Sequence, residues 1–406
     1  MLENIFVVAK QSVMGFLSGF LPEASLPFIS SFLSIAPILG IFPLLFALTT
    51  IFERKGLGRI QNRRGPNRVG IPMTDIRIAG FGQFIADGIK SLTKEDIVPS
   101  SADKLIHFLA PVALIIPVLL MFSVLPFGKN LVPLDMKNGL LFFFAVGAAS
   151  ELSIFMAGWS SRNKYSLLGA MRAIAQMISY EMPFILSSLV VVMAAGSLSL
   201  VDIAEAQTGG IWNWHVFTPW GLLGMILFFI AAMAEANRSP FDLPEGESEL
   251  VAGYFTEYSG FKFAIFFMAE YLGLFAALSV WITLFFGGWN GPFGQYSLLP
   301  SYLWFMLKLV LCIFFIIWIR GTMPRIRMDQ LMNFAWKFML PMCLINLLGA
   351  GSGYYIRQTF PQSPLAGWFF EWLVVGTALF WIWLELGDRI AGKALTQKRE
   401  YRYADQ

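Results

Sequence analysis

The chain of 406 residues is 57% hydrophobic and only 14% charged, against roughly 25% charged residues in a typical soluble protein. Several apolar runs exceed about 18 residues without alternating polar positions, which predicts membrane-spanning helices and excludes a soluble domain or a membrane barrel. The net charge of +3 is spread over connecting segments, so it indicates membrane topology and not nucleic-acid binding. The expected fold class is an all-α polytopic membrane protein.

The first 27 residues are predicted to form an amphipathic helix at the membrane surface. Glu3 stands where a signal peptide would carry basic residues, and Lys10 interrupts the apolar run, so a signal peptide is not expected. One face of the helix collects the apolar side chains. These are Leu2, Ile5, Phe6, Ala9, Val13, Phe16, Leu17 and Phe20.

About nine segments are expected to cross the membrane, since each is apolar over a length that spans a bilayer. The predicted spans are 28–52, 104–127, 138–160, 166–196, 217–236, 261–287, 302–322, 329–350 and 366–388. We therefore divide the chain into the interfacial helix 1–27, a core bundle 28–350, an additional C-terminal span 351–388 and a basic tail 389–406.

The orientation follows from the basic residues, which concentrate in alternate connecting segments. These are the loops 53–103, 160–166, 236–261 and 321–329 and the tail 389–406. Membrane proteins retain Lys and Arg on the cytoplasmic side, so we expect the N-terminus outside and the C-terminus in the cytoplasm. An odd number of spans agrees with ends on opposite sides.

The long loop 53–103 contains a basic stretch and a predicted amphipathic helix over 81–92. An apolar stripe opposes a polar stripe at helical spacing, which is typical of a helix at the membrane surface. The apolar stripe is Phe81, Phe84, Ile85, Ile89 and Leu92, and the polar stripe is Gln83, Asp87, Lys90 and Lys94. Packing against lipid or a partner accounts for this pattern, and so does the wall of an entrance for an amphiphilic molecule.

Three carboxylates lie inside predicted spans, at Glu151, Glu181 and Glu270. A charge at the bilayer centre costs roughly 2.5–3.5 kcal/mol on insertion scales, so such residues are functional candidates. Hydrogen bonding between helices is the alternative role. Glu181 ends a polar stripe that must face the bundle interior or a hydrated cavity. The stripe also contains Arg172, Gln176, Ser179 and Tyr180.

The segment 235–258 joins two predicted spans and gathers six carboxylates around one cation, Arg238. The carboxylates are Glu235, Asp242, Glu245, Glu247, Glu249 and Glu257. Because the segment leads into the span of Glu270, its acids can approach that residue, and close carboxylates couple their protonation. This coupling suits a proton relay, and a solvated acidic surface is the alternative. Pro240 and Phe241 among the acids favour a folded, partly buried loop.

The sequence predicts no cofactor site of its own. Cys312 and Cys343 lie far apart inside apolar segments, and the two histidines, His107 and His215, are too few for the paired ligands of a membrane haem. The glycine motifs of nucleotide-binding proteins are absent from the sequence. We therefore expect no nucleotide, flavin, haem or metal bound by this chain.

Five stretches together resemble a single family, the quinone-site membrane subunit of respiratory complex I, known as the H subunit in bacteria and as subunit 1 in mitochondria. They run in order from about residue 50 to about residue 345. The stretches are ERKGLGRIQNRRGPNRVG, QFIADGIKSLTKED, AGWSSRNKYSLLGAMRAIAQMISYE, AEANRSPFDLPEGESELVAGYFTEYSGFKFAIFFMAEY and RGTMPRIRMDQLMNFAWKFMLP.

The resemblance implies a subunit of a proton-translocating NADH:quinone oxidoreductase in the bacterial inner membrane, without catalysis by the isolated chain. It implies that quinone is the substrate and that FMN and iron–sulfur clusters belong to partner subunits. The implied partners are the peripheral-arm quinone-site subunits and antiporter-like membrane subunits.

The resemblance also implies roles for particular residues. The implied quinone-chamber residues are Arg54, Gln83, Phe84, Asp87, Arg238 and Glu247. The implied proton-coupling residues are Glu181, Glu235, Asp242, Glu245 and Glu270. Glu151 is an additional proton-coupling candidate, at a position where an apolar residue is expected in many members.

Other functions stay open at this point. The homologous subunit of a membrane-bound hydrogenase, or of a ferredoxin- or F420-dependent oxidoreductase, would share these motifs, and the electron donor of the assembly would distinguish it. A stand-alone ion transporter predicts two related halves with interrupted spans, which are not visible in the sequence. A pure scaffold leaves the deep glutamates without a role.

Overall fold

The computed structural model describes residues 5–17, 26–70, 79–242, 252–294, 299–360, 367–381 and 384. Within these ranges the regular elements are all helical, apart from an isolated bridge between Gly128 and Leu131. The expected all-α fold is therefore confirmed for the described residues. The tail 389–406 and the loop carboxylates Glu245, Glu247 and Glu249 lie outside them.

The described helices fall into a longer and a shorter group. The long elements are α1 (Ile5–Leu17), α2 (Leu26–Ile60), α3 (Gln83–Thr93), α4 (Lys104–Met121), α5 (Gly139–Ser160), α6 (Lys164–Ala195), α8 (Pro219–Glu235), α10 (Gly260–Phe285), α11 (Ser301–Thr322) and α13 (Leu340–Thr359). The short ones are η3 (Phe122–Val124), α7 (Leu200–Ala206), η4 (Ile211–Asn213), η5 (His215–Phe217), η6 (Gly253–Phe255), α12 (Met328–Phe334) and the π-helical turn η8 (Ala335–Met339). A further apolar helix spans Gly367–Trp381.

Local sequence signals begin and end these helices. The side chain of Asp103 accepts a hydrogen bond from the Ile106 amide at the start of α4, and Asn163 does the same for Tyr165 at the start of α6. Thr218 caps α8, whose first residue is a proline with its backbone angle already suited to a helix. Gly196 ends α6 in the left-handed conformation.

Seven helices are long and apolar enough to cross a membrane, so seven of the nine expected spans are confirmed at that level. They are Phe32–Ile60, Lys104–Val124, Gly139–Ser160, Lys164–Ala195, Gly260–Phe285, Ser301–Thr322 and Met328–Thr359. The segments expected at 217–236 and 366–388 contain shorter apolar helices, Pro219–Glu235 and Gly367–Trp381. The surface helix predicted within 1–27 contains α1, and the one predicted at 81–92 overlaps α3, which begins two residues later and ends one residue later.

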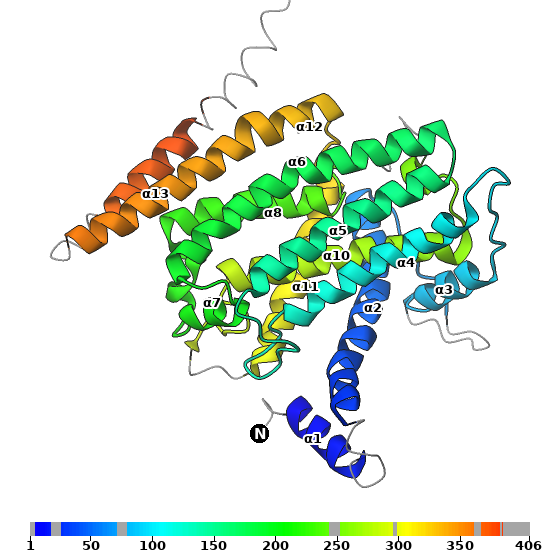
Figure 1. Ribbon diagram of the computed structural model, residues 1–406, viewed down its shortest axis with the longest axis horizontal. Coiled ribbons are helices and arrows are strands. Elements are labelled where there is room, and N and C mark those ends of the chain that lie inside the picture. Colours follow the sequence, from blue (N-terminus) through cyan, green and yellow to red (C-terminus); the bar gives the residue numbers. More distant parts are fainter. Residues whose placement is uncertain are drawn as a thin grey trace, which may run out of the picture.

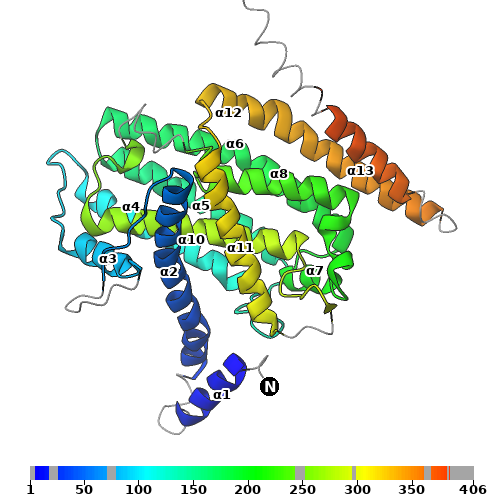
Figure 2. The same cartoon turned by 180° about the vertical axis from the view of Figure 1, so that it is seen from behind.

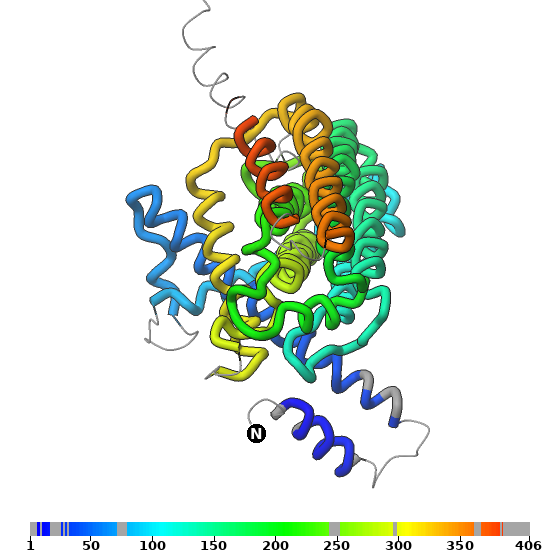
Figure 3. The backbone as a smooth tube through the Cα atoms, turned by 90° about the vertical axis from the view of Figure 1, so that its left-hand side faces the viewer, coloured from blue at the N-terminus to red at the C-terminus, as the bar shows by residue number. Residues whose placement is uncertain are grey.

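Helix α10 is the centre of the packed bundle. Helices α4 and α8 pack against it, α5 packs on α4, and α6 packs on α8, while α2 extends away toward α1 (Figure 1). Figure 2 shows the molecule from behind, where α11 packs against α2 and also contacts α10. Viewed from the end, α10 lies inside the other helices, and Gly367–Trp381 lies beside α13 (Figure 3). Most residues in the second half of α10 are buried, so this half of the helix lies in the core of the bundle.

Candidate functional site

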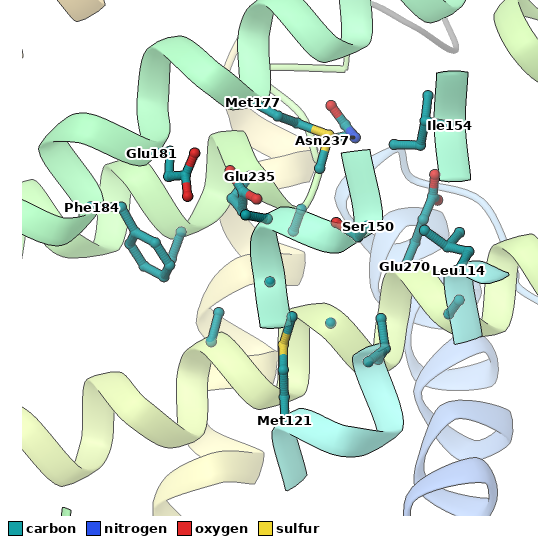
Figure 4. Close-up of a pocket in the computed structure, with 18 of the residues that line it drawn as sticks. Leu114, Met121, Ser150, Ile154, Met177, Glu181, Phe184, Glu235, Asn237 and Glu270 are labelled. Carbon is teal, nitrogen blue, oxygen red and sulfur yellow. Dashed lines mark hydrogen bonds between the residues drawn. The ribbon is translucent and has the colours of Figure 1, made fainter. Parts of the chain in front are cut away.

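A cavity of about 70 Å³ lies between α4, α5, α6, α8 and α10 (Figure 4). Most of its lining is apolar, but Glu181, Glu235 and Glu270 all border it. A water molecule needs roughly 10–15 Å³ of such space and several polar partners, so the cavity has room for more than one water. The structure thus gathers the carboxylates of three helices around a space that can be hydrated.

The three carboxylates come from different elements. Glu181 lies midway along α6, Glu235 is the last residue of α8, and Glu270 lies in the first half of α10. In Figure 4 their side chains follow one another across the cavity. Glu151 on α5 lies close enough to Glu181 and Glu235 for their charges to interact.

Two of these acids carry an oxygen that needs a partner. One carboxyl oxygen of Glu151 and one of Glu235 are buried, and neither accepts a hydrogen bond from the described residues. Leaving a buried acceptor unpaired costs about 1–3 kcal/mol, more if it is charged. A proton satisfies such an oxygen, and for Glu235, which borders the cavity, a water in the cavity does so as well.

Glu270 joins the cavity to the loop that follows α8. The hydroxyl of Tyr254 donates a hydrogen bond to Glu270 Oε1 at 2.7 Å, and the Arg238 guanidinium lies 4.0 Å from Glu270 Oε2. Arg238 is buried and stacks on the ring of Tyr271 at 3.8 Å. The segment therefore contacts Glu270 through Arg238 and Tyr254, and among the described residues only Glu235, of the acids predicted to approach Glu270, borders the same cavity.

A second buried polar cluster lies next to Arg238, centred on Glu53. Glu53 forms an ion pair with Arg320 of α11 and accepts a hydrogen bond from the hydroxyl of Tyr271. Arg238 borders the same small cavity. Glu53 was not identified as a site residue from the sequence, because it directly follows the predicted span 28–52. An acid at that place is expected to lie at the membrane surface and to contact water. The available signal was an acidic residue directly before the basic stretch.

Three of the predicted chamber residues meet where α2 faces α3. Arg54 Nη1 lies 2.7 Å from Asp87 Oδ2, and Gln83 donates to Asp87 Oδ1 at 2.9 Å. Phe84 is half-buried on the same helix, whereas Ile89 and Leu92 are exposed. Arg238 lies apart from this group, in the Glu53 cluster, and Glu247 lies outside the described residues.

The described ends of the acidic loop are anchored to the bundle. At the first end, Gln176 donates to the carbonyl oxygens of Ala234 and Phe241 and to Asn237 Oδ1. Asp242 is buried and forms an ion pair with Arg325 at 2.9 Å. Asp242 is thus not among the residues that line the cavity.

The far end of the loop is held by Tyr258. Its ring stacks on His107 at 4.0 Å, and its hydroxyl lies 3.3 Å from Ser160 Oγ. Burial raises the pKa of Tyr258 to about 12, so the phenol stays neutral at physiological pH. Gln176, Ser179 and Tyr180 of the predicted polar stripe are buried, as expected for a stripe that faces the bundle.

These features define a class: a polytopic helical membrane protein with an internal carboxylate cavity connected to a polar cluster near the end of its first long helix. Among the described residues, no group of three or more His, Cys, Asp or Glu could hold a metal ion.

Comparisons with known proteins identify the family. The model of the NADH dehydrogenase family matches residues 33–351. The chain is 44% identical over 360 residues to the NADH-quinone oxidoreductase H subunit of Carboxydothermus hydrogenoformans, covering 88% of this chain and 98% of that protein. It is 50% identical over 299 residues to the H subunit of Dehalococcoides mccartyi, covering 73% and 79%. The H subunit of Geobacillus kaustophilus is 45% identical over 322 residues, covering 78% and 93%.

The chain belongs to this family of NADH-quinone oxidoreductase H subunits, and the resemblance drawn from its motifs is confirmed. It is accordingly a multi-pass membrane subunit of a bacterial NADH-quinone oxidoreductase complex. The matched range 33–351 contains every helix that borders the cavity.

Proposed function

We propose that the chain forms part of a quinone chamber and couples quinone reduction to proton translocation through its intramembrane carboxylates. The observation that carries this proposal is the cavity shared by Glu181, Glu235 and Glu270, with Arg238 linking Glu270 to the Glu53 cluster. Buried acids beside a space that can hold water provide a path for protons. Placing such acids inside the membrane costs free energy, and a purely structural role does not account for that cost.

The quinone-facing part is proposed to be the junction of α2 and α3. Arg54, Gln83 and Asp87 form a hydrogen-bonded group there, and α3 also carries the exposed apolar side chains of Ile89 and Leu92. An amphiphilic quinone has a polar ring and an apolar tail, so it matches a surface that offers both. Phe84 and Glu247 complete the proposed chamber residues.

Charge is proposed to link the two parts. Reduction of a quinone to a quinol takes up two electrons and two protons, and acids that supply these protons are left with negative charge near the Arg54–Asp87 pair. Glu53 is the neighbour of Arg54 and shares a cavity with Arg238, which lies 4.0 Å from Glu270. Unit charges at that separation interact by roughly 4 kcal/mol at an effective dielectric constant of about 20. An interaction of this size is enough to decide whether Glu270 holds a proton.

From Glu270 the relay is proposed to continue to Glu235, Glu181 and Glu151 around the cavity. Asp242 and Glu245 are proposed as loop positions that feed the relay, with Asp242 acting through its pair with Arg325. We further propose nine spans with the N-terminus outside. The proposed partners are the peripheral-arm quinone-site subunits and antiporter-like membrane subunits, with FMN and iron–sulfur clusters held by partner subunits of the complex.

The relay is tested by replacing Glu270 or Glu245 with Gln in the complete complex. We expect Glu270→Gln and Glu245→Gln to slow NADH:quinone oxidoreduction several-fold and to lower the number of protons moved per electron, because Gln cannot release a proton. Oxidation of NADH by ferricyanide should stay unchanged if it occurs at a partner's flavin. Glu205→Gln, at an exposed position on α7, is the matched control. Normal rates and normal proton yield in both variants would contradict the relay.

A further inference from the structure

The C-terminal end of α10 is closed by side chains from other elements of the bundle. Glu270 lies in the first half of α10, and the helix ends at Phe285. The last carbonyl oxygens of any helix lack partners within the helix and carry its partial negative charge. At this end of α10, Gln207 and His215 bind carbonyl oxygens of the last turn, and Lys308 binds the carbonyl oxygen of the C-cap residue, Phe286.

Each of the three side chains takes a different carbonyl group. Gln207, which follows α7, donates to the Thr283 oxygen at 2.9 Å. His215 of η5 places Nδ1 2.9 Å from the Leu284 oxygen. A carbonyl oxygen only accepts, so Nδ1 carries the hydrogen. Burial lowers the pKa of His215, which keeps the imidazole neutral at physiological pH.

Lys308 of α11 makes the most extensive contacts. Its ammonium group donates to the carbonyl oxygens of Phe286, Gly288 and Asn290 at 2.6, 2.9 and 2.7 Å. It also lies 4.2 Å from the ring centroid of Trp214. Among the described residues, no carboxylate lies within ion-pair distance of Lys308. The charge is therefore held by the carbonyl dipoles at the negative end of α10 and in the turn that follows it, and by an aromatic face.

The surrounding turn fits these groups closely. The Gln207 side-chain oxygen accepts from the amides of His215 and Gly287, so both ends of its side-chain amide are engaged. Gly287 has a φ of 73°, and a Cβ there would lie 2.5 Å from Trp214 Nε1. A lysine inside an apolar span is costly, and in this place it completes a network that holds one helix end.

We propose that Lys308, together with Gln207 and His215, is a positioning residue that fixes α10 along its axis and thereby sets the place of Glu270 in the carboxylate cavity. The inference rests on the proposed role of Glu270. Residues 270 and 285 are separated by about 22 Å along a straight helix at 1.5 Å per residue. A packed helix moves as a rigid rod, so releasing its end shifts Glu270 relative to Glu235 and Glu181.

The first test replaces Lys308 with Met in the complete complex, which keeps the length of the side chain and removes its donors. We expect kcat for NADH:quinone oxidoreduction to fall roughly tenfold, less than the roughly 100-fold that misplacement by an ångström can cost. The KM for quinone should stay unchanged, because the Arg54–Asp87 group on α2 and α3 makes no hydrogen bond or ion pair with Lys308, Gln207 or His215, all of which lie in the described part of the chain. The control is Lys129→Met, an exposed lysine outside the cap. Wild-type kcat and proton yield in an assembled Lys308→Met complex would overturn the inference.

If Lys308→Met prevents assembly of the complex, two variants of His215 test the positioning role instead. His215→Asn retains a side-chain amide that can donate to the Leu284 oxygen, whereas His215→Ala leaves that oxygen unpaired. We expect Asn to preserve kcat and proton yield and Ala to lower both with the KM unchanged. Equal activity in the two variants would overturn the inference.

The parallel variant Glu270→Gln separates the two proposals. Loss of coupling in Glu270→Gln, with none in the cap variants, rejects the positioning role and leaves the relay intact. Normal coupling in Glu270→Gln rejects the relay itself. It also rejects the proposal that Lys308, Gln207 and His215 act by positioning Glu270.

Discussion

At the scale of single residues, Glu53 is a buried carboxylate that depends on its partners for compensation of its charge. Its carboxylate is buried and is shared between Arg320 and Tyr271, next to Arg238. Removing one partner of a buried ion pair costs about 3–5 kcal/mol, because the other charge is left uncompensated. Substitution of a single member of the cluster is therefore expected to destabilise the protein. Because Glu53 adjoins Arg54 in the sequence, the cluster also has a place in the proposed coupling.

We predict that Glu53→Ala lowers the amount of assembled complex, since Arg320 then lacks its partner. The double variant Glu53→Gln with Arg320→Met should recover assembly but not quinone reductase activity, because the charge that links the two polar groups is gone. Native gel electrophoresis and NADH:quinone rates measure the two effects separately. Asp135→Asn, an exposed acid, is the control. Full activity in the double variant would exclude Glu53 from the coupling.

At the scale of elements, the contact between α13 and the helix Gly367–Trp381 depends on small residues. A Cβ at Gly353 would collide with the side chain of Glu371, and a Cβ at Gly349 would lie 2.9 Å from Val374. Glu371 is buried and pairs with Arg357 at 2.5 Å. Small residues let two helices approach closely in a membrane, and the ion pair holds the register.

We predict that Gly353→Leu weakens this pairing by about 1–3 kcal/mol, the usual cost of overpacking. The matched control is Gly376→Leu, since a Cβ at Gly376 has no atom within 4 Å. Thermal unfolding of the chain in the purified complex measures the difference. Equal unfolding temperatures for the two variants would mean that the α13 contact does not depend on Gly353.

At the scale of the whole molecule, the proposed topology puts the loop after the first span in the cytoplasm and the loop after α6 outside. Ser101 and Thr208 are exposed positions in these two loops. The natural cysteines, Cys312 and Cys343, are half-buried and buried, and replacing both with Ala gives a background for labelling.

We predict that Ser101→Cys reacts with a membrane-impermeant maleimide only in inside-out vesicles, and Thr208→Cys only in right-side-out vesicles. The reason is the retention of Lys and Arg on the cytoplasmic side. The extent of labelling in each vesicle type is the measurement. Labelling of both positions from the same side would require a different number of spans between them.

Much of the architecture could be predicted because the membrane acts on the chain locally. A lipid environment forces each segment to satisfy its own backbone hydrogen bonds, so a long apolar run becomes a helix wherever it packs. Glu181 and Glu270 could be identified as functional candidates for the same reason, since an acid within a long apolar segment is unusual whatever its neighbours in the fold are. The approach of the loop after α8 to Glu270 followed from chain connectivity alone.

What the tertiary structure alone decided are pairings between segments distant in the sequence. Glu53 meets Arg320 because α2 packs on α11, and Lys308 meets the end of α10 because α11 crosses it. No local pattern encodes such partners, since they depend on how side chains of several helices fill the same space. The sequence by itself determined the membrane class, the family and the acids within the spans. The packing of α10 decided which of those acids share a cavity and what holds them there.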